Sequence, residues 1–236
     1  MYVLTYNAPH RKTQDLLFRL KMKGYDNVVV LAVPWINRKN FVSLIPHRHF
    51  NVLDVNPIDI CDKFQYEFVE IKMKELLTYF ENNERDLVLY AGAGILPADV
   101  VNSVEVINSH PAYLPFTRGL DSYKWAIYYN NPLGVSTHIM AEEVDAGMLI
   151  KRKLLNLYSW DTFHSAANRQ YELEVDMLVD SIDDMKTSDF IELDTNSVAQ
   201  RRMPNFMEGK MLEKFKEIIS NIPVSDKKQK SYTKLG

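Results

Sequence analysis

Two short and almost purely apolar runs constrain the fold of this chain more than any other feature. They are NVVVLAV at 27–33 and LVLY at 87–90. Runs of this kind, rich in valine and leucine and without polar alternation, are typical of strands that are covered on both faces. The first run is preceded by YVLTY at 2–6 and by TQDLLFRLKMKG at 13–24, whose leucines repeat at helical spacing. The order strand, helix, strand predicts right-handed crossovers and parallel strands.

The remainder of the chain continues this alternation and predicts an α/β protein. We expect an open, mostly parallel twisted sheet with helices on both faces, plus a small carboxyl-terminal appendage. Further strands are expected at 51–55, 104–108, 134–140 and 148–155, and helices at 68–83, 121–129 and 160–185.

Length and composition are those of an ordinary globular protein. The chain has 236 residues, of which 46% are hydrophobic and 25% charged. We expect one large domain over 1–187. Charge rises after it, so 188–236 is expected to form a carboxyl-terminal extension that ends in a solvated, flexible tail, DKKQKSYTKLG.

Charge and hydropathy argue against two classes of partner. The net charge of -3 and the pI near 6.1 provide no basic footprint for nucleic acid. Apolar runs fall short of the roughly 20 residues that span a bilayer, and the start MYVLTYNAPHRK lacks the features of a signal peptide. We therefore expect a cytoplasmic protein that binds neither nucleic acid nor membrane. The lone Cys61 is expected to be a packed small hydrophobe.

The segment NSHPAYLPFTRG at 108–119 is the first candidate site. If the strand at 104–108 stays extended to His110, the side chains of Asn108 and His110 share one face at its carboxyl end. Open α/β sheets bind ligands at that edge. The local residues alone leave open a simpler interpretation, a loop with a hydrogen-bonded histidine.

A second segment, THIMAEEVDAG at 137–147, favours a site. Its acidic turn ends in Asp145 followed by alanine and glycine, which let a backbone approach another group closely, whereas the Glu142 and Glu143 side chains are expected to be solvated. An amide, an imidazole and a carboxylate at neighbouring strand ends suit acyl transfer. The first two can donate to a developing oxyanion, and the carboxylate can orient the imidazole.

The linked motifs resemble the 10-formyltetrahydrofolate-dependent formyltransferase family. They are Asn108-x-His110-Pro111-x-x-Leu114-Pro115-x-x-x-Gly119, then Gly134-x-x-Thr137-His138, then Asp145-x-Gly147. The resemblance implies a Rossmann-like sheet, N10-formyltetrahydrofolate as co-substrate, and Asn108, His110 and Asp145 as the catalytic trio. Whether His110 donates to the oxyanion or takes the amine proton stays open.

The preceding AGAGILP at 91–97 resembles the folate-pocket strand and loop of that family. A pterin edge requires main-chain donors and acceptors, which this loop and the acidic turn can provide. The expected folate residues are Gly92, Ala93, Gly94, Ile95, Leu96, Ala141, Glu142, Val144 and Asp145. No metal is expected, since His47-x-His49 has no third ligand nearby in sequence.

The substrate class follows from departures within the motifs. Tyr113 makes the chain more similar to bacterial sugar N-formyltransferases, which act on nucleotide-linked amino sugars for cell-surface glycans such as lipopolysaccharide O-antigen. TYNAPHRKTQ replaces the glycine- and serine-rich phosphate loop of glycinamide ribonucleotide enzymes, and the chain is short for the full barrel of methionyl-tRNA enzymes. Formyl transfer to glycinamide ribonucleotide or another amine, and a noncatalytic folate-binding domain, remain alternatives.

A nucleotide-linked sugar carries a pyrophosphate, which cations recognise, and flat groups on which aromatic rings stack. The expected substrate residues are Asn7, His10, Arg11, Lys12, Trp35, Arg38, Tyr113 and Arg118. The last fifty residues need not all fold onto their own domain, so we also expect a homodimer.

Overall fold

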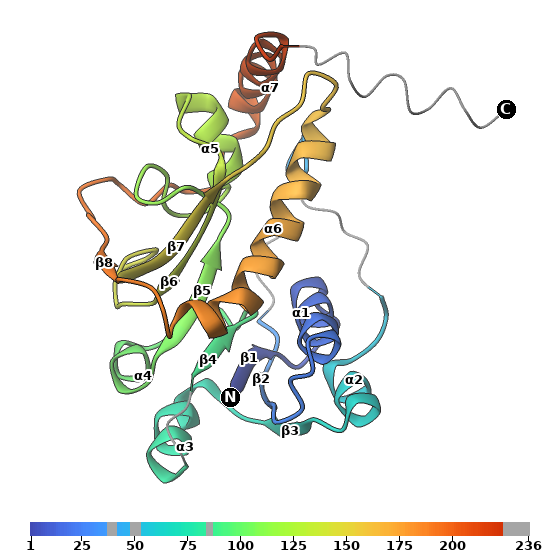
Figure 1. Ribbon diagram of the computed structural model, residues 1–236, viewed down its shortest axis with the longest axis vertical. Helices are drawn as coiled ribbons and strands as arrows, with labels where there is room; N and C mark the ends of the chain where they lie inside the picture. The colour runs from blue at the N-terminus through green and yellow to red at the C-terminus, as the bar shows by residue number, and fades with distance from the viewer. Residues whose placement is uncertain (37–41, 48–52, 84–86, 224–236) are drawn as a thin grey trace, which may run out of the picture.

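The computed structural model describes residues 1–36, 42–47, 53–83 and 87–223, and a single sheet runs through these residues (Figure 1). Its strands are β1 (Tyr2–Tyr6), β2 (Val29–Val33), β3 (Glu67–Glu70), β4 (Val88–Tyr90), β5 (Val106–His110), β6 (Gly134–Ile139), β7 (Met148–Leu154) and β8 (Ile191–Glu192). Their spatial order is β3-β2-β1-β4-β5-β6-β7-β8. β1 to β5 pair in parallel, and β6, β7 and β8 are added antiparallel. The expected open α/β sheet is confirmed.

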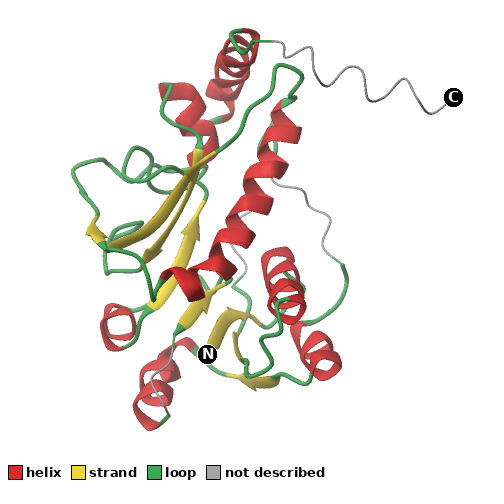
Figure 2. Cartoon of the chain, in the orientation of Figure 1, coloured by secondary structure: helices red, strands yellow, loops and turns green. Residues whose placement is uncertain are grey.

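Helices cover both faces of the parallel half (Figure 2). They are α1 (Arg11–Met22), α2 (Pro57–Phe64) and α6 (Phe163–Asp184) on one face, and a 3-10 turn η1 (Met73–Glu75), α3 (Leu76–Asn82) and α4 (Ala98–Ser103) on the other. The alternation of side chains along β1 explains both layers. Val3 packs with Leu16 of α1, whereas Leu4 packs with Phe80 of α3.

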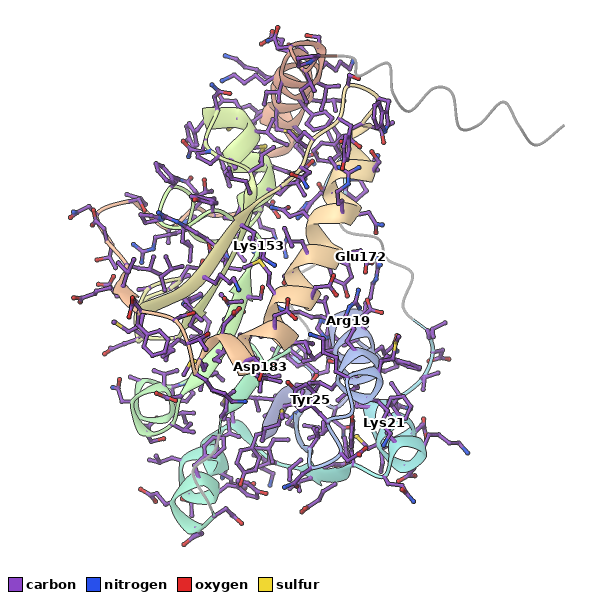
Figure 3. All side chains as sticks on the ribbon, in the orientation of Figure 1. Arg19, Lys21, Tyr25, Lys153, Glu172 and Asp183 are labelled. Carbon is purple, nitrogen blue, oxygen red and sulfur yellow. The ribbon has the colours of Figure 1, made fainter. Side chains whose placement is uncertain are left out.

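Charged residues also join α1 to α6 (Figure 3). Arg19 of α1 pairs with Glu172 of α6, and its Nε lies 2.8 Å from Oδ1 of Asp176. These contacts fix the long helix α6 across the sheet, behind the strand that carries Asn108 and His110.

Two expectations about local structure were wrong, and helix α2 is an element that was not predicted. Residues 67–70 form the edge strand β3 rather than the start of a helix, because Phe68 and Val69 pair with β2 and turn to opposite faces, a period of two. Helix α2 was not expected; Pro57 occupies its first turn and Asn56 with Asp59 forms its capping box. Residues 53–55 lie outside any strand, held by the Gln14 side chain, while 51–52 lie outside the described residues.

The carboxyl-terminal part of the chain packs against the rest at two places. β8 extends the sheet beside β7, and α7 (Asn205–Ser220) packs on α5 (Ser122–Tyr129) in a shared apolar cluster. A fully buried ion pair joins these two helices, with Nζ of Lys124 at 2.6 Å from Oε1 of Glu208. The domain boundary expected near 187 stays a prediction. Within the described part of the chain, no helix is both long and apolar enough to cross a membrane.

Candidate active site

The site begins with the register between β5 and β6. Asn108 lies opposite His138, and His110 lies opposite Ser136. Directly opposed residues of antiparallel strands point to the same face of a sheet, as do residues two apart on one strand. All four side chains therefore share one face at the carboxyl end of β5. Ser136 holds the loop that follows, since its Oγ accepts from Leu114 N and donates to Ala112 O, both at 2.9 Å.

His110 is the buried centre of this group, with 6% of its surface exposed. Its Nδ1 lies 3.2 Å from Oδ1 of Asp145. Its Nε2 is buried and has no hydrogen-bond partner among the described residues. Because a carboxylate only accepts, a hydrogen on Nδ1 suits Asp145 and leaves Nε2 available to a bound molecule.

Asp145 is positioned by its backbone and by a second hydrogen bond. It adopts a left-handed conformation with φ of 50°, in the turn between β6 and β7. Gly119 N donates to its Oδ2 at 2.7 Å, so both carboxylate oxygens are engaged. Gly147 ends the turn where a Cβ would lie 2.1 Å from Ile139 O, a contact that excludes any side chain.

The predicted cation Arg118 is buried and holds this turn. Its guanidinium donates to Val144 O at 3.0 and 2.6 Å and to the carbonyls of Thr195 and Ser197 at 2.8 and 2.9 Å. The backbone on both sides of Gly119 is held as well, because Gln200 N donates to Arg118 O and Leu120 N donates to Gln200 O, both at 2.8 Å. Arg118 thus joins the turn that carries Asp145 to the carboxyl-terminal segment.

Lys12 is the second predicted cation that the structure buries. Its Nζ lies 2.8 Å from Oε1 of Glu174 on α6 and donates to Ser109 O at 3.2 Å. Ser109 stands between Asn108 and His110 on β5. The pair therefore supports β5 from the face opposite to Asn108 and His110.

His138 is a member of the site for which no separate role was predicted. Its Nδ1 lies 2.8 Å from Ala146 O, and its Nε2 lies 3.4 Å from Nδ2 of Asn108. Complete burial lowers its pKa to about 4, so the ring is neutral near pH 7. The signal that could have revealed it was the antiparallel pairing of β5 with β6, which places it opposite Asn108.

The expected folate residues fall on two segments beside the trio. Residues 92–96 follow β4, the parallel neighbour of β5, so they lie at the same edge as His110. Tyr90 OH donates to Gly94 O at 2.5 Å and braces this loop, from which Ile95 projects with 85% of its surface exposed. Residues 141–145 form the turn that carries Asp145.

Several expected substrate residues lie where β1 and β4 end side by side. Trp35, half exposed, packs edge-on against Tyr6 with ring centroids 4.7 Å apart. His10 also packs edge-on against Tyr6, with ring centroids 5.7 Å apart, and lies against Gly92. Asn7 enters the same region through its main chain, since its N donates to Val33 O. The point where strand order reverses is where open α/β sheets bind ligands.

Other members of the predicted substrate set lie elsewhere. Arg11 is turned toward α6, with its guanidinium 4.3 Å from the Tyr171 ring centroid and near Asp15. Tyr113 lies in the loop after β5, and Arg152 of β7 stacks on its ring. Arg38 falls outside the described residues, as does His49. Among the described residues, no group of three or more His, Cys, Asp or Glu could hold a metal ion.

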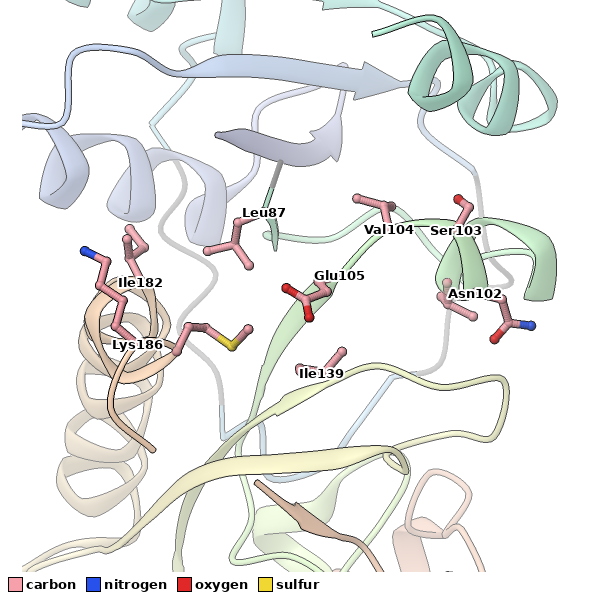
Figure 4. A pocket seen from close by; sticks show the side chains of 10 residues that line it. Leu87, Asn102, Ser103, Val104, Glu105, Ile139, Ile182 and Lys186 are labelled. Atoms are coloured by element: carbon pink, nitrogen blue, oxygen red, sulfur yellow. The ribbon is translucent and has the colours of Figure 1, made fainter. Parts of the chain in front are cut away.

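The structure also has a pocket of about 670 Å³ at the amino end of β5 (Figure 4). Leu87, Val104, Glu105 and Ile182 are among its lining residues. It contains none of the predicted site residues.

Cys61 is buried in the core, and burial raises the pKa of its thiol to about 12, which agrees with a packing role.

Comparison with known sequences identifies related proteins. A family described as formyl transferase matches residues 11–182. A methionyl-tRNA formyltransferase of Thermotoga maritima is 27% identical over 141 residues, covering 57% of this chain and 45% of the relative. A dTDP-4-amino-4,6-dideoxyglucose formyltransferase of Mycobacterium bovis is 24% identical over 94 residues, covering 40% of each chain. The chain thus spans less than half the length of these curated relatives.

Solved structures share the fold at low identity. A sugar N-formyltransferase from Shewanella gives a TM-score of 0.56 at 20% identity, covering 85% of this chain and 75% of that one. A phosphoribosylglycinamide formyltransferase from Campylobacter jejuni gives 0.58 at 20%, covering 79% and 97%. A formyltransferase from Anoxybacillus kamchatkensis, solved with UDP-4,6-dideoxy-4-formamido-L-AltNAc and tetrahydrofolate, gives 0.53 at 15%, covering 86% of each.

Proposed function

This chain belongs to the formyl transferase family, and we propose that it transfers a formyl group from N10-formyltetrahydrofolate to the primary amine of a nucleotide-linked amino deoxysugar. The observation that carries the proposal is the geometry of His110. Its Nδ1 faces Asp145, its Nε2 is buried and without a partner among the described residues, and Asn108 shares its face of the sheet.

We assign the three residues the following roles. The bound folate supplies the formyl carbon that the neutral amine attacks, and residues 92–96 and 141–145 would hold it through main-chain atoms. Asn108 donates from Nδ2 to the formyl oxygen as that oxygen gains negative charge. His110 accepts the amine proton at Nε2, and Asp145 stabilises the resulting imidazolium through Nδ1–H. As the bond from carbon to N10 breaks, His110 returns that proton to N10.

The amino sugar is favoured over other amines by two observations. One sequence relative is named as a dTDP-4-amino-4,6-dideoxyglucose formyltransferase. One protein of similar fold was solved with a UDP-linked formamido sugar. The exposed Trp35, beside Tyr6 and His10, offers an aromatic surface at the strand-order switch, where a nucleobase or sugar ring could stack. Lys12 and Arg118 are engaged inside the protein, and Arg11 pairs with Asp15 and lies over Tyr171 of α6. We therefore assign these three to support of the site and leave phosphate contacts to Arg38.

Formyl transfer to glycinamide ribonucleotide is the second candidate, and the likeness of fold to phosphoribosylglycinamide formyltransferases favours it. The phosphate of glycinamide ribonucleotide would need a glycine- and serine-rich loop after β1. This chain has TYNAPHRKTQ there, which argues against that substrate.

The test is an amine panel. The purified chain is mixed with N10-formyltetrahydrofolate and, separately, with dTDP-4-amino-4,6-dideoxyglucose, a UDP-linked 4-amino sugar or glycinamide ribonucleotide. Release of tetrahydrofolate is followed over time, with Asn108→Ala as the control. We expect turnover with an amino-sugar nucleotide, lowered about 10²- to 10³-fold by the substitution. Turnover only with glycinamide ribonucleotide supports the second candidate. Folate binding without turnover of any amine supports a noncatalytic domain.

We further propose that the enzyme acts in the cytoplasm as a homodimer, in the synthesis of cell-surface glycans such as lipopolysaccharide O-antigen. Exposed apolar side chains on the carboxyl-terminal part, such as Val198 and Phe206, support self-association. Sedimentation at several concentrations tests it, and a single monomer mass throughout would contradict the dimer.

A further inference from the structure

We propose that His138 is a positioning residue, which holds the Asn108 side chain with its NH₂ group rather than its oxygen directed to the reacting centre. The inference rests on the proposed function, in which Asn108 donates to the formyl oxygen. It concerns a side chain that the proposed reaction itself does not use.

The fold places the two side chains together. Asn108 of β5 and His138 of β6 are directly opposed in the antiparallel register, where side chains of a pair are in contact range. Between Thr137 and His138 the pairing of β6 with β7 shifts in register, so the strand is locally irregular at this residue. The result is a distance of 3.4 Å between Nε2 of His138 and Nδ2 of Asn108.

The other ring nitrogen determines what Nε2 can do. Nδ1 of His138 lies 2.8 Å from Ala146 O, and a carbonyl only accepts, so Nδ1 carries the hydrogen. Burial disfavours a second proton on the ring, although the charge of Asp145 acts in the opposite direction and His110 adds to the burial effect. Nε2 therefore presents a lone pair, which can only accept a hydrogen bond.

A lone pair at this position distinguishes the two ends of an amide. Nδ2 of Asn108 can donate one hydrogen to His138 and keeps the other for the site. If the amide turned over, Oδ1 would face the lone pair, and the repulsion disfavours that rotamer. Without the acceptor, both orientations are open, and one of them places an oxygen where the developing oxyanion needs a donor.

The contact between His138 and Ala146 O also supports the turn that carries Asp145. This structural role has to be separated from the positioning of Asn108. Two substitutions divide the contacts of the ring between them. Asn reaches the position of Nδ1, so His138→Asn can keep the bond to Ala146 O and loses the acceptor for Asn108. Gln reaches the position of Nε2, so His138→Gln can keep that acceptor and loses the bond to Ala146.

The experiment measures kcat and KM of both full-length variants with N10-formyltetrahydrofolate and the amine found active in the panel. We expect His138→Asn to lower kcat roughly 10- to 100-fold with KM nearly unchanged, and His138→Gln to stay within several-fold of the parent. The reverse ranking would show that the turn, not the amide, is what His138 holds, and would overturn the proposal.

A double variant ties the effect to Asn108. In the Asn108→Ala background, His138→Asn should lower kcat by less than about 3-fold further, because the group it positions is gone. A full additional loss would contradict the proposal. If Asn108→Ala alone keeps near-parental activity, the role of Asn108 in the proposed function fails instead, and the two failures are thus distinct.

A measurement on the unmodified protein covers the possibility that the variants do not fold. Nitrogen NMR of the histidine rings distinguishes the two neutral tautomers. We expect His138 to carry its hydrogen on Nδ1 at pH 7. A hydrogen on Nε2 would face the NH₂ of Asn108 with a second donor and would overturn the inference.

Discussion

Gly119 N donates a hydrogen bond to Oδ2 of Asp145 at 2.7 Å, while Oδ1 of the same carboxylate faces Nδ1 of His110 at 3.2 Å. The carboxylate therefore connects the loop after β5 to the imidazole. Its two oxygens are both acceptors, which an amide of the same shape cannot reproduce.

Asp145→Asn should accordingly lower kcat by roughly 10²- to 10⁴-fold, because one of the two contacts is lost and no charge remains to stabilise an imidazolium. Tetrahydrofolate release measures the effect. Glu143→Gln, two residues away and largely exposed, is the matched control and should leave kcat within about 2-fold. An equal loss in both variants would point to disruption of the turn rather than to the chemistry of Asp145.

Gly119→Ala should destabilise the fold by about 3 kcal/mol or more, since the residue has a φ of 90° and a Cβ would lie 2.2 Å from Gln200 O. Urea unfolding measures the change. Gly24→Ala has a similar φ of 81° with open space around the Cβ, so it should cost only about 1 kcal/mol. Equal costs at the two sites would mean that the clash with Gln200 is relieved by movement of that segment.

Lys12→Met should cost about 3 to 5 kcal/mol of unfolding free energy, because Glu174 would lose the cation 2.8 Å away while remaining buried. The double substitution Lys12→Met with Glu174→Leu should recover much of this loss, since no buried charge remains. Urea unfolding of the three proteins decides it. A single variant that unfolds at the same denaturant concentration as the parent would refute a buried, charge-paired Lys12.

The pKa of His138 predicts a particular dependence of stability on pH. Burial lowers this pKa from 6.5 to about 4 in the folded protein. Between these values the unfolded chain binds a proton that the folded protein does not, so stability falls as pH decreases from about 6.5 to about 4. The full contribution is about 3 kcal/mol. Unfolding free energies at pH 7 and pH 4 should therefore differ less in His138→Asn than in the parent, and an identical difference would contradict this assignment.

Local patterns were sufficient to predict much of the parallel half of the sheet. The apolar runs at 27–33 and 87–90 became β2 and β4, and the spacing of Asn108 and His110 placed both on one face of β5. These features depend on residues close in sequence. The edge strand β3 and helix α2 were missed. In a short segment, the spacing of apolar residues does not distinguish a helix from a strand, because packing against the rest of the fold decides between them.

The partners of the buried cations could not be predicted from the sequence, for a different reason. Lys12 and Arg118 are cationic residues of the kind that bind ligands at a surface. Their partners instead include Glu174 for Lys12 and the carbonyls of Thr195 and Ser197 for Arg118, all more than seventy residues away along the chain. Only the folded arrangement brings such groups together. The role of His138 could be predicted only from the pairing register of β5 with β6, because that role depends on which residue of β5 it lies opposite.

The contact between Gly119 and Gln200 also sets an order of events during synthesis. Asn108, His110 and Asp145 are translated well before Gln200, whose backbone pairs with that of Gly119. Until residues 195–200 are translated, Arg118 lacks two of its carbonyl acceptors and Gly119 lacks its backbone contact with Gln200. Completion of the predicted site therefore depends on residues 195–200, which are translated after Asn108, His110 and Asp145.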